Sequence, residues 1–108
     1  MIAQITPAEV ADWQRDASRE PPVLVDVREP WETAMCRIEG SLLVPLGSVP
    51  ARIAELPADR DLVLVCHHGN RSQRAAQWLE QNGYTRLYNL VGGVERWATE
   101  VDPQMARY

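Results

Sequence analysis

The chain has 108 residues, a net charge of −4 and 45% hydrophobic residues, which suit one compact domain and are too few for two. All 11 basic residues are arginines and they form no basic cluster, which argues against a nucleic-acid partner. With no apolar run of membrane-spanning length, no signal-peptide pattern and only two cysteines, we expect a cytoplasmic protein without a membrane association.

Short apolar segments alternate with segments of helical spacing along the whole chain. We predict strands at residues 2–5, 23–27, 41–44, 62–65 and 86–90. We predict helical segments at residues 7–18, around 30–32, at 49–56, at 72–82 and from 94 onward. Strands separated by segments of helix length favour parallel pairing with right-handed crossovers. The sequence therefore predicts a doubly wound α/β fold, with a mostly parallel central sheet of about five strands and helices on both faces. A tail at residues 102–108 is expected on the surface.

Two kinds of residue support these boundaries. Thr6 is a suitable N-cap and Pro7 fits the first position of the helix that follows it. Gly83 is suited to the position just after a helix. Trp31, Trp78 and Trp97 fall on predicted helices, where we expect them to be packing residues.

The candidate nucleophile is Cys66, which ends the strand at residues 62–65 and begins a loop that leads into a helix. A parallel strand delivers its last side chain to the carboxyl edge of the sheet, where open α/β folds place their ligands. Gly69 allows the loop backbone to point several N–H groups at one spot, and the helix adds the positive end of its dipole. Both effects favour a thiolate over a thiol, which makes Cys66 a reactive cysteine.

Three charged residues are expected near this loop. Arg71 closes it and offers its guanidinium to an oxyanion or to an internal carboxylate. Asp26 and Arg28 end another strand, and parallel strands end at the same edge of the sheet, so both residues are expected near Cys66 although they are distant in sequence. We interpret Asp26 as a residue that organises loops in preference to a catalytic base.

His67 and His68 follow Cys66 directly. Adjacent histidines in such a loop point in different directions, and their spacing with the cysteine matches no zinc pattern. We therefore predict no metal and no cofactor. The two side chains either line the mouth of the site or extend into solvent.

In combination, the motifs of the chain resemble the single-domain rhodanese, or thiosulfate sulfurtransferase, family. The matching segments keep the family order from about residue 5 to residue 100: residues 24–29, 38–41, 44–45, 66–72, 82–84 and 90–97. One position departs from the family pattern. The family commonly has Gly-His-Ile where this chain has Cys36-Arg37-Ile38, so the role of that histidine is not carried over to Arg37.

The resemblance implies an enzyme with a covalent, two-step mechanism. The cysteine attacks the outer sulfur of a small anionic donor such as thiosulfate and keeps it as a persulfide. A thiophilic acceptor, such as cyanide or the thiol of a protein or small molecule, then removes the sulfur. The residues implied to bind the donor and the persulfide are His67, His68, Gly69, Asn70, Arg71 and Ser72, with Asp26 and Arg28 in support.

Loop length and charge refine this expectation. Related phosphatases and arsenate reductases on this fold use a loop one residue longer than the six residues from Cys66 to Arg71. This difference favours sulfur transfer over phosphate hydrolysis or arsenate reduction. The mercaptopyruvate-using branch has a small, uncharged loop, whereas His67, His68, Arg71 and Arg74 predict a cationic rim suited to thiosulfate.

Two alternatives stay open. The same fold can serve as a persulfide carrier or a protein-interaction module with little turnover of its own. Cys36 is interpreted as a structural or half-exposed thiol, with a redox-active disulfide to Cys66 as the alternative.

Overall fold

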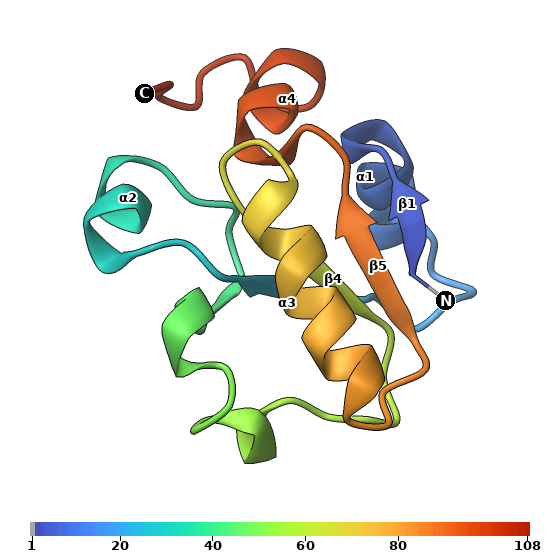
Figure 1. The fold of residues 1–108 in the computed structure, drawn as a ribbon. Coiled ribbons are helices and arrows are strands. Elements are labelled where there is room, and N and C mark those ends of the chain that lie inside the picture. The colour runs from blue at the N-terminus through green and yellow to red at the C-terminus, as the bar shows by residue number, and fades with distance from the viewer. Residues whose placement is uncertain (1) are drawn as a thin grey trace.

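The computed structural model describes residues 2–108 and contains one five-stranded parallel sheet (Figure 1). The strands lie in the order β1-β5-β4-β2-β3. Their bounds are β1 Ala3–Ile5, β2 Val23–Asp26, β3 Leu42–Leu43, β4 Leu62–Val65 and β5 Leu87–Leu90. The predicted fold class is confirmed, and the loop after the central strand β4 is the loop that begins with Cys66.

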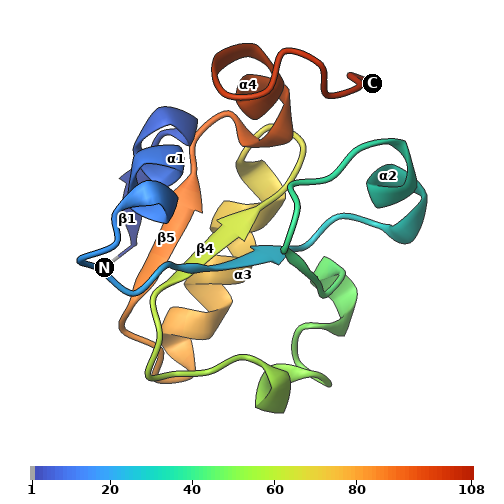
Figure 2. The same ribbon diagram turned by 180° about the vertical axis from the view of Figure 1, so that it is seen from behind.

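Helices cover both faces of this sheet (Figures 1 and 2). The α-helices are α1 Pro7–Arg15, α2 Pro30–Met35, α3 Asn70–Gln81 and α4 Gly93–Glu100, and two short 3-10 helices are η1 Leu46–Ser48 and η2 Ile53–Glu55. Helix α3 packs on one face, and α1 and α4 share a core with the other. Helix α2 stands outside these layers, beyond the carboxyl end of β2. No helix within residues 2–108 is long and apolar enough to cross a membrane.

The central strand explains why both faces need a cover. All four residues of β4 are fully buried. Side chains alternate along a strand, so Leu62 and Leu64 join the core beneath α3, while Val63 and Val65 join the core beneath α1 and α4. Such a continuous apolar run is typical of a parallel strand between two helical layers.

The helix boundaries follow local chemistry closely. Thr6 caps α1 as predicted: its Oγ1 accepts from the Glu9 N–H, and the Glu9 carboxylate accepts from the Thr6 N–H. The helix ends at Arg15, three residues before the predicted end, because the Asp16 carboxylate instead binds the backbone and hydroxyl of Ser18 in a turn.

Two other expectations were wrong. The segment 49–56 forms no continuous helix: only the short η2 forms within it, and η1 ends just before it. Trp31 was expected to be a packing residue, and its ring does contact the Tyr108 ring edge-on at 6.0 Å between centroids, but it is 62% exposed on α2 and joins no core. Trp97 is buried and Trp78 half-buried, as expected of packing residues.

Candidate active site around Cys66

Cys66 lies at the carboxyl end of β4 and is almost fully buried. Its Sγ accepts a hydrogen bond from the Gly69 N–H at 3.0 Å. Gly69 is the N-cap of α3 and has a φ of +105°, a conformation that L side chains rarely adopt and that turns the loop back toward the sulfur. The predicted convergence of thiol, glycine loop and helix N-terminus is therefore present.

Backbone N–H groups of α4 bind the first two carbonyl groups of the loop. The Cys66 carbonyl accepts from the Val94 N–H at 2.9 Å, and the His67 carbonyl accepts from the Glu95 N–H at 3.1 Å. The first-turn N–H groups of α3, at Asn70, Arg71 and Ser72, have no acceptor within their own helix. The carbonyls thus face α4, which leaves the N–H groups at the start of α3 available to a charge on the sulfur.

Gly93 permits this close contact between α4 and the loop. A Cβ at this position would lie 2.3 Å from the Cys66 carbonyl oxygen and 2.4 Å from that of His67. Because Gly93 has no side chain, α4 can lie directly against the loop.

Arg71 finds an internal carboxylate, one of the two partners that the sequence allowed. Its Nη1 and Nη2 each donate to one oxygen of Glu32 at 2.7 Å. Glu32 is buried and also accepts from the Glu29 N–H and the Tyr108 hydroxyl. The hydrogen bonds from Arg71 hold the pKa of Glu32 at about 2. Sequence reasoning missed Glu32, which is separated from Arg71 by 39 residues and carries no motif that marks it.

Asp26 and Arg28 form a second buried pair. Arg28 is fully buried and its Nη2 donates to Asp26 Oδ2 at 2.7 Å. The same nitrogen donates to the Cys36 carbonyl at 2.8 Å, and Nη1 donates to the Tyr108 hydroxyl at 3.0 Å. Because Arg28 occupies the Asp26 carboxylate, the geometry favours an organising role for Asp26 over that of a base.

The end of the chain packs against the loop, which the sequence did not indicate. The Tyr108 ring stacks on the His67 ring with a centroid separation of 3.9 Å, and His67 stacks in turn on His68 at 3.9 Å. The expectation that the two histidines point in different directions was therefore wrong, because their rings lie against each other. Most of the segment 102–108 is exposed, as predicted, but Met105 and Tyr108 are half-buried. Burial raises the pKa of Tyr108 to about 12, so its hydroxyl stays protonated at neutral pH.

Ser72 and Asn89 complete the surroundings of the sulfur. Ser72 Oγ lies 3.3 Å from Cys66 Sγ and 2.5 Å from Asn89 Oδ1. Both side chains are buried. Asn89 lies within β5, and the sequence pattern marked it only as a strand residue.

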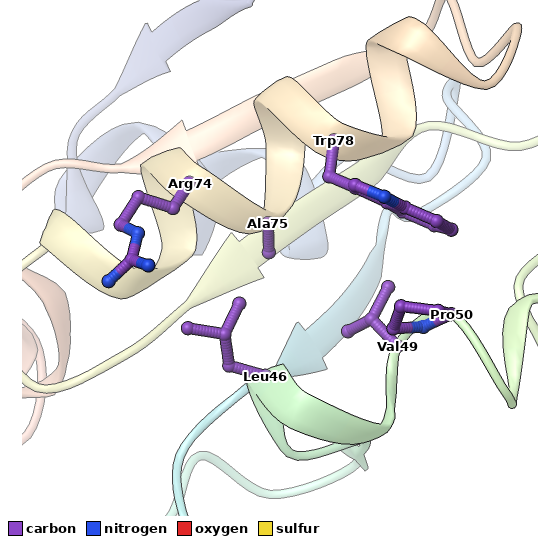
Figure 3. A pocket seen from close by; sticks show the side chains of 6 residues that line it. All are labelled: Leu46, Val49, Pro50, Arg74, Ala75 and Trp78. Atoms are coloured by element: carbon purple, nitrogen blue, oxygen red, sulfur yellow. The ribbon is translucent and has the colours of Figure 1, made fainter.

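The predicted cationic rim is weaker than the residue count suggested. Glu32 neutralises Arg71, and burial lowers the pKa of His67. Arg74 is exposed and lines an apolar pocket between α3 and η1 (Figure 3). His68 is exposed and stacks on His67. The rim therefore offers less free positive charge than four basic side chains would imply.

The remaining predicted residues are placed as follows. Cys36 is a half-buried free thiol, and Cys66 is also free, so the structure contains no disulfide between them. Arg37 is exposed beside a pocket that Trp97 and Met105 also line. No group of three His, Cys, Asp or Glu side chains within residues 2–108 is arranged to hold a metal ion.

Known proteins are similar to this chain in both sequence and fold. The rhodanese-like domain family matches residues 6–100. A sulfurtransferase of Allochromatium vinosum is 43% identical over 86% of this chain and 87% of its own length. Thiosulfate sulfurtransferase GlpE of Pseudomonas aeruginosa is 37% identical over 87% of this chain and 82% of its length. The crystal structure of a rhodanese-like domain protein from Staphylococcus aureus matches with a TM-score of 0.83 and 30% identity, covering 93% of this chain and 95% of that one. The chain belongs to the rhodanese-like sulfurtransferase family.

Proposed function

We propose that this protein is a thiosulfate sulfurtransferase that carries the transferred sulfur as a persulfide on Cys66. The observation that carries the proposal is the buried Cys66 sulfur, which accepts the Gly69 N–H beside the first turn of α3, whose N–H groups have no acceptor within their own helix. These donors suit an anion bound to the sulfur and require no metal.

The reaction has two steps. In the first, the Cys66 thiolate attacks the outer sulfur of thiosulfate, the sulfur–sulfur bond of the donor breaks, and sulfite leaves with the bonding electron pair. In the second, cyanide or a thiolate attacks the outer sulfur of the persulfide and releases the Cys66 thiolate. The loop's N–H groups stabilise the negative charge of the outer sulfur between the steps, with charge-assisted hydrogen bonds that are stronger than neutral ones.

The partner of Arg71 supports sulfur transfer over phosphate chemistry. A guanidinium binds a phosphate or arsenate through two parallel N–H groups. In this structure Nη1 and Nη2 of Arg71 each donate one hydrogen bond to Glu32. A tetrahedral oxyanion in the six-residue loop from Cys66 to Arg71 would therefore compete with Glu32 for the Arg71 guanidinium, whereas one sulfur atom is within the reach of the backbone donors.

The choice of thiosulfate as donor rests on family relatives and on the polar loop. Relatives that are 37% and 38% identical over more than four-fifths of both chains carry the name thiosulfate sulfurtransferase. His68 is exposed at the loop, and the start of α3 adds positive potential where the donor would enter. Faster turnover with mercaptopyruvate than with thiosulfate would refute this choice.

Intact-mass measurement tests the persulfide directly. After incubation with thiosulfate and removal of excess donor, we expect the protein to gain the mass of one sulfur atom and to form thiocyanate when cyanide is added. Cys66→Ser should abolish both signals, while the matched variant Cys36→Ser should retain both. Sulfur loading that survives in Cys66→Ser, or disappears in Cys36→Ser, would overturn the assignment to Cys66.

A protein thiol as acceptor is the second candidate, favoured by the exposed apolar surface of α2. Trp31 is 62% exposed and Met35 is 49% exposed, and both lie on the helix whose Glu32 binds Arg71. Under this alternative the domain docks a partner and turns over cyanide slowly. Transfer to a protein thiol that is much faster than transfer to cyanide, and that slows when Trp31 is replaced by Gln, would favour it.

A further inference from the structure

The inner side of Cys66 is bordered by a chain of polar side chains that no step of the proposed reaction uses. Ser72 Oγ lies 3.3 Å from the Cys66 sulfur and 2.5 Å from Asn89 Oδ1. Asn89 Nδ2 donates to the Gly69 carbonyl at 3.2 Å and to Gln4 Oε1 at 2.9 Å. Ser72 is fully buried and Asn89 is 5% exposed, so water does not compete for these bonds.

The orientation of the Asn89 amide follows from the Gly69 carbonyl. A carbonyl oxygen can only accept, so the amide must turn its Nδ2 toward Gly69. Its Oδ1 then faces Ser72, where it accepts the hydroxyl hydrogen. A serine hydroxyl has one hydrogen, so Ser72 presents only lone pairs to the Cys66 sulfur.

We propose that Asn89 is a positioning residue that holds the Ser72 hydroxyl hydrogen away from Cys66, so that Ser72 accepts from the thiol and does not donate to the thiolate. A thiolate at Cys66 is then stabilised by the loop N–H groups alone. If Ser72 turned its hydrogen to the sulfur, the buried Asn89 oxygen would lose its donor, which is costly.

If the proposed function holds, this arrangement affects the relative stability of the two states of Cys66, the free thiolate and the persulfide. In the free thiolate the charge lies on Sγ, beside the lone pairs of Ser72. In the persulfide the charge lies on the outer sulfur, and Sγ is neutral, so the Ser72–Asn89 bond is undisturbed. Asn89 thereby favours the loaded cysteine over the free thiolate.

The test is the pH dependence of Cys66 alkylation by iodoacetamide, measured in a Cys36→Ser background so that one thiol reports. Asn89→Leu is close in size and removes the acceptor for the Ser72 hydrogen. We expect the midpoint of the alkylation profile to fall by about one pH unit, a tenfold change in the thiol–thiolate equilibrium, because a freed hydroxyl gains the thiolate as its acceptor. Ser72→Ala should not raise the midpoint, since it removes no donor from the thiolate.

The double variant separates this effect from a general loosening of the loop. With Ser72→Ala present, Asn89→Leu should no longer shift the midpoint. An unshifted midpoint in Asn89→Leu alone, or an equal shift with and without Ser72, would overturn the proposal. If Asn89→Leu does not fold, Ser72→Ala alone decides, because a raised midpoint would show that Ser72 donates to the thiolate.

Other ionisable groups near the site are unchanged in every variant and contribute a common background. Arg71 on α3 is electrostatically coupled to Cys66. Other such groups are His67 and His68 in the loop, Asp26 and Arg28 at the end of β2, Glu32 on α2, Glu95 on α4, and Tyr108. Because alkylation needs no sulfur donor, failure of this proposal is distinguishable from failure of sulfur transfer, which the intact-mass measurement reports.

Discussion

Replacing Glu32 by Gln removes the charge that fixes Arg71, and its effect on stability follows from the structure. Arg71 and two further hydrogen bonds lower the pKa of Glu32 from 4.5 to about 2. At about 1.4 kcal/mol per pH unit, this shift corresponds to about 3 kcal/mol of folding free energy. One third of the Arg71 side chain is exposed, so water screens part of the interaction and about 3 kcal/mol is an upper value.

The sign of the pH dependence is fixed by the direction of the shift. A carboxylate with a lowered folded-state pKa contributes its full stability above its ordinary pKa of 4.5 and loses it as the pH falls to about 2. In urea unfolding followed by circular dichroism, we therefore expect Glu32→Gln to be less stable than wild type at neutral pH. The difference should shrink between pH 4.5 and pH 2.

Glu55→Gln is the matched control, since Glu55 binds Arg52 through two similar hydrogen bonds on the exposed surface. Ion pairs on the surface contribute little to stability, so the free energy of unfolding of this variant should equal that of wild type. A stability difference for Glu32→Gln that does not change with pH, or that is no larger than the effect of Glu55→Gln, would refute the reasoning.

Substitutions at Gly93 and Tyr108 test the contacts that hold the loop. Gly93→Ala places a Cβ against the Cys66 carbonyl, so thermal unfolding should show a loss of about 1–3 kcal/mol in the free energy of unfolding, together with reduced sulfur loading. A Cβ at Gly47 would meet no atom within 4 Å, so the control Gly47→Ala should match wild type. Equal effects of the two substitutions would contradict the close contact between Gly93 and the loop. Tyr108→Phe keeps the stack on His67 and loses the hydroxyl bonds to Arg28 and Glu32, so it should cost about 1 kcal/mol. Tyr108→Ala also loses the stack and should speed alkylation of Cys66 more than Tyr108→Phe does; equal rates for the two variants would show that the ring does not restrain the loop.

Local sequence chemistry was sufficient to predict the fold and the position of the cysteine. The β4 segment is apolar at every position, and a loop that contains glycine follows it. An apolar run this short is typical of a buried strand, whereas a buried helix would be longer. The apolar positions of α3 fall at Ala75, Ala76 and Leu79 with helical spacing, and all three are buried. Since β4 runs parallel to β2 and β5, Cys66, which directly follows β4, lies at the carboxyl edge of the sheet.

The side-chain partners of the loop could not be predicted in the same way. Glu32 and Tyr108 reach the loop from segments far away in sequence, and a glutamate or tyrosine has no local pattern that indicates a buried partner. Asn89 fits a strand pattern as an ordinary interruption, and its contact to Ser72 depends on the register of β5 beside β4. Trp31 was misplaced because helical spacing on the six-residue α2 does not tell which side faces the protein.

The two arginine–carboxylate pairs, Asp26–Arg28 and Glu32–Arg71, determine how much side-chain charge is available to the Cys66 sulfur. Buried ion pairs are often no more stabilising than apolar residues of the same volume, so positioning is the better account of their presence. Arg28 and Glu32 both bind the Tyr108 hydroxyl, which joins the Asp26–Arg28 pair to the Glu32–Arg71 pair in one network beside the loop. Each guanidinium charge in this network has a carboxylate partner. The charge that acts on the Cys66 sulfur therefore comes chiefly from backbone N–H groups, whose fixed direction suits a single anionic sulfur atom better than a large oxyanion.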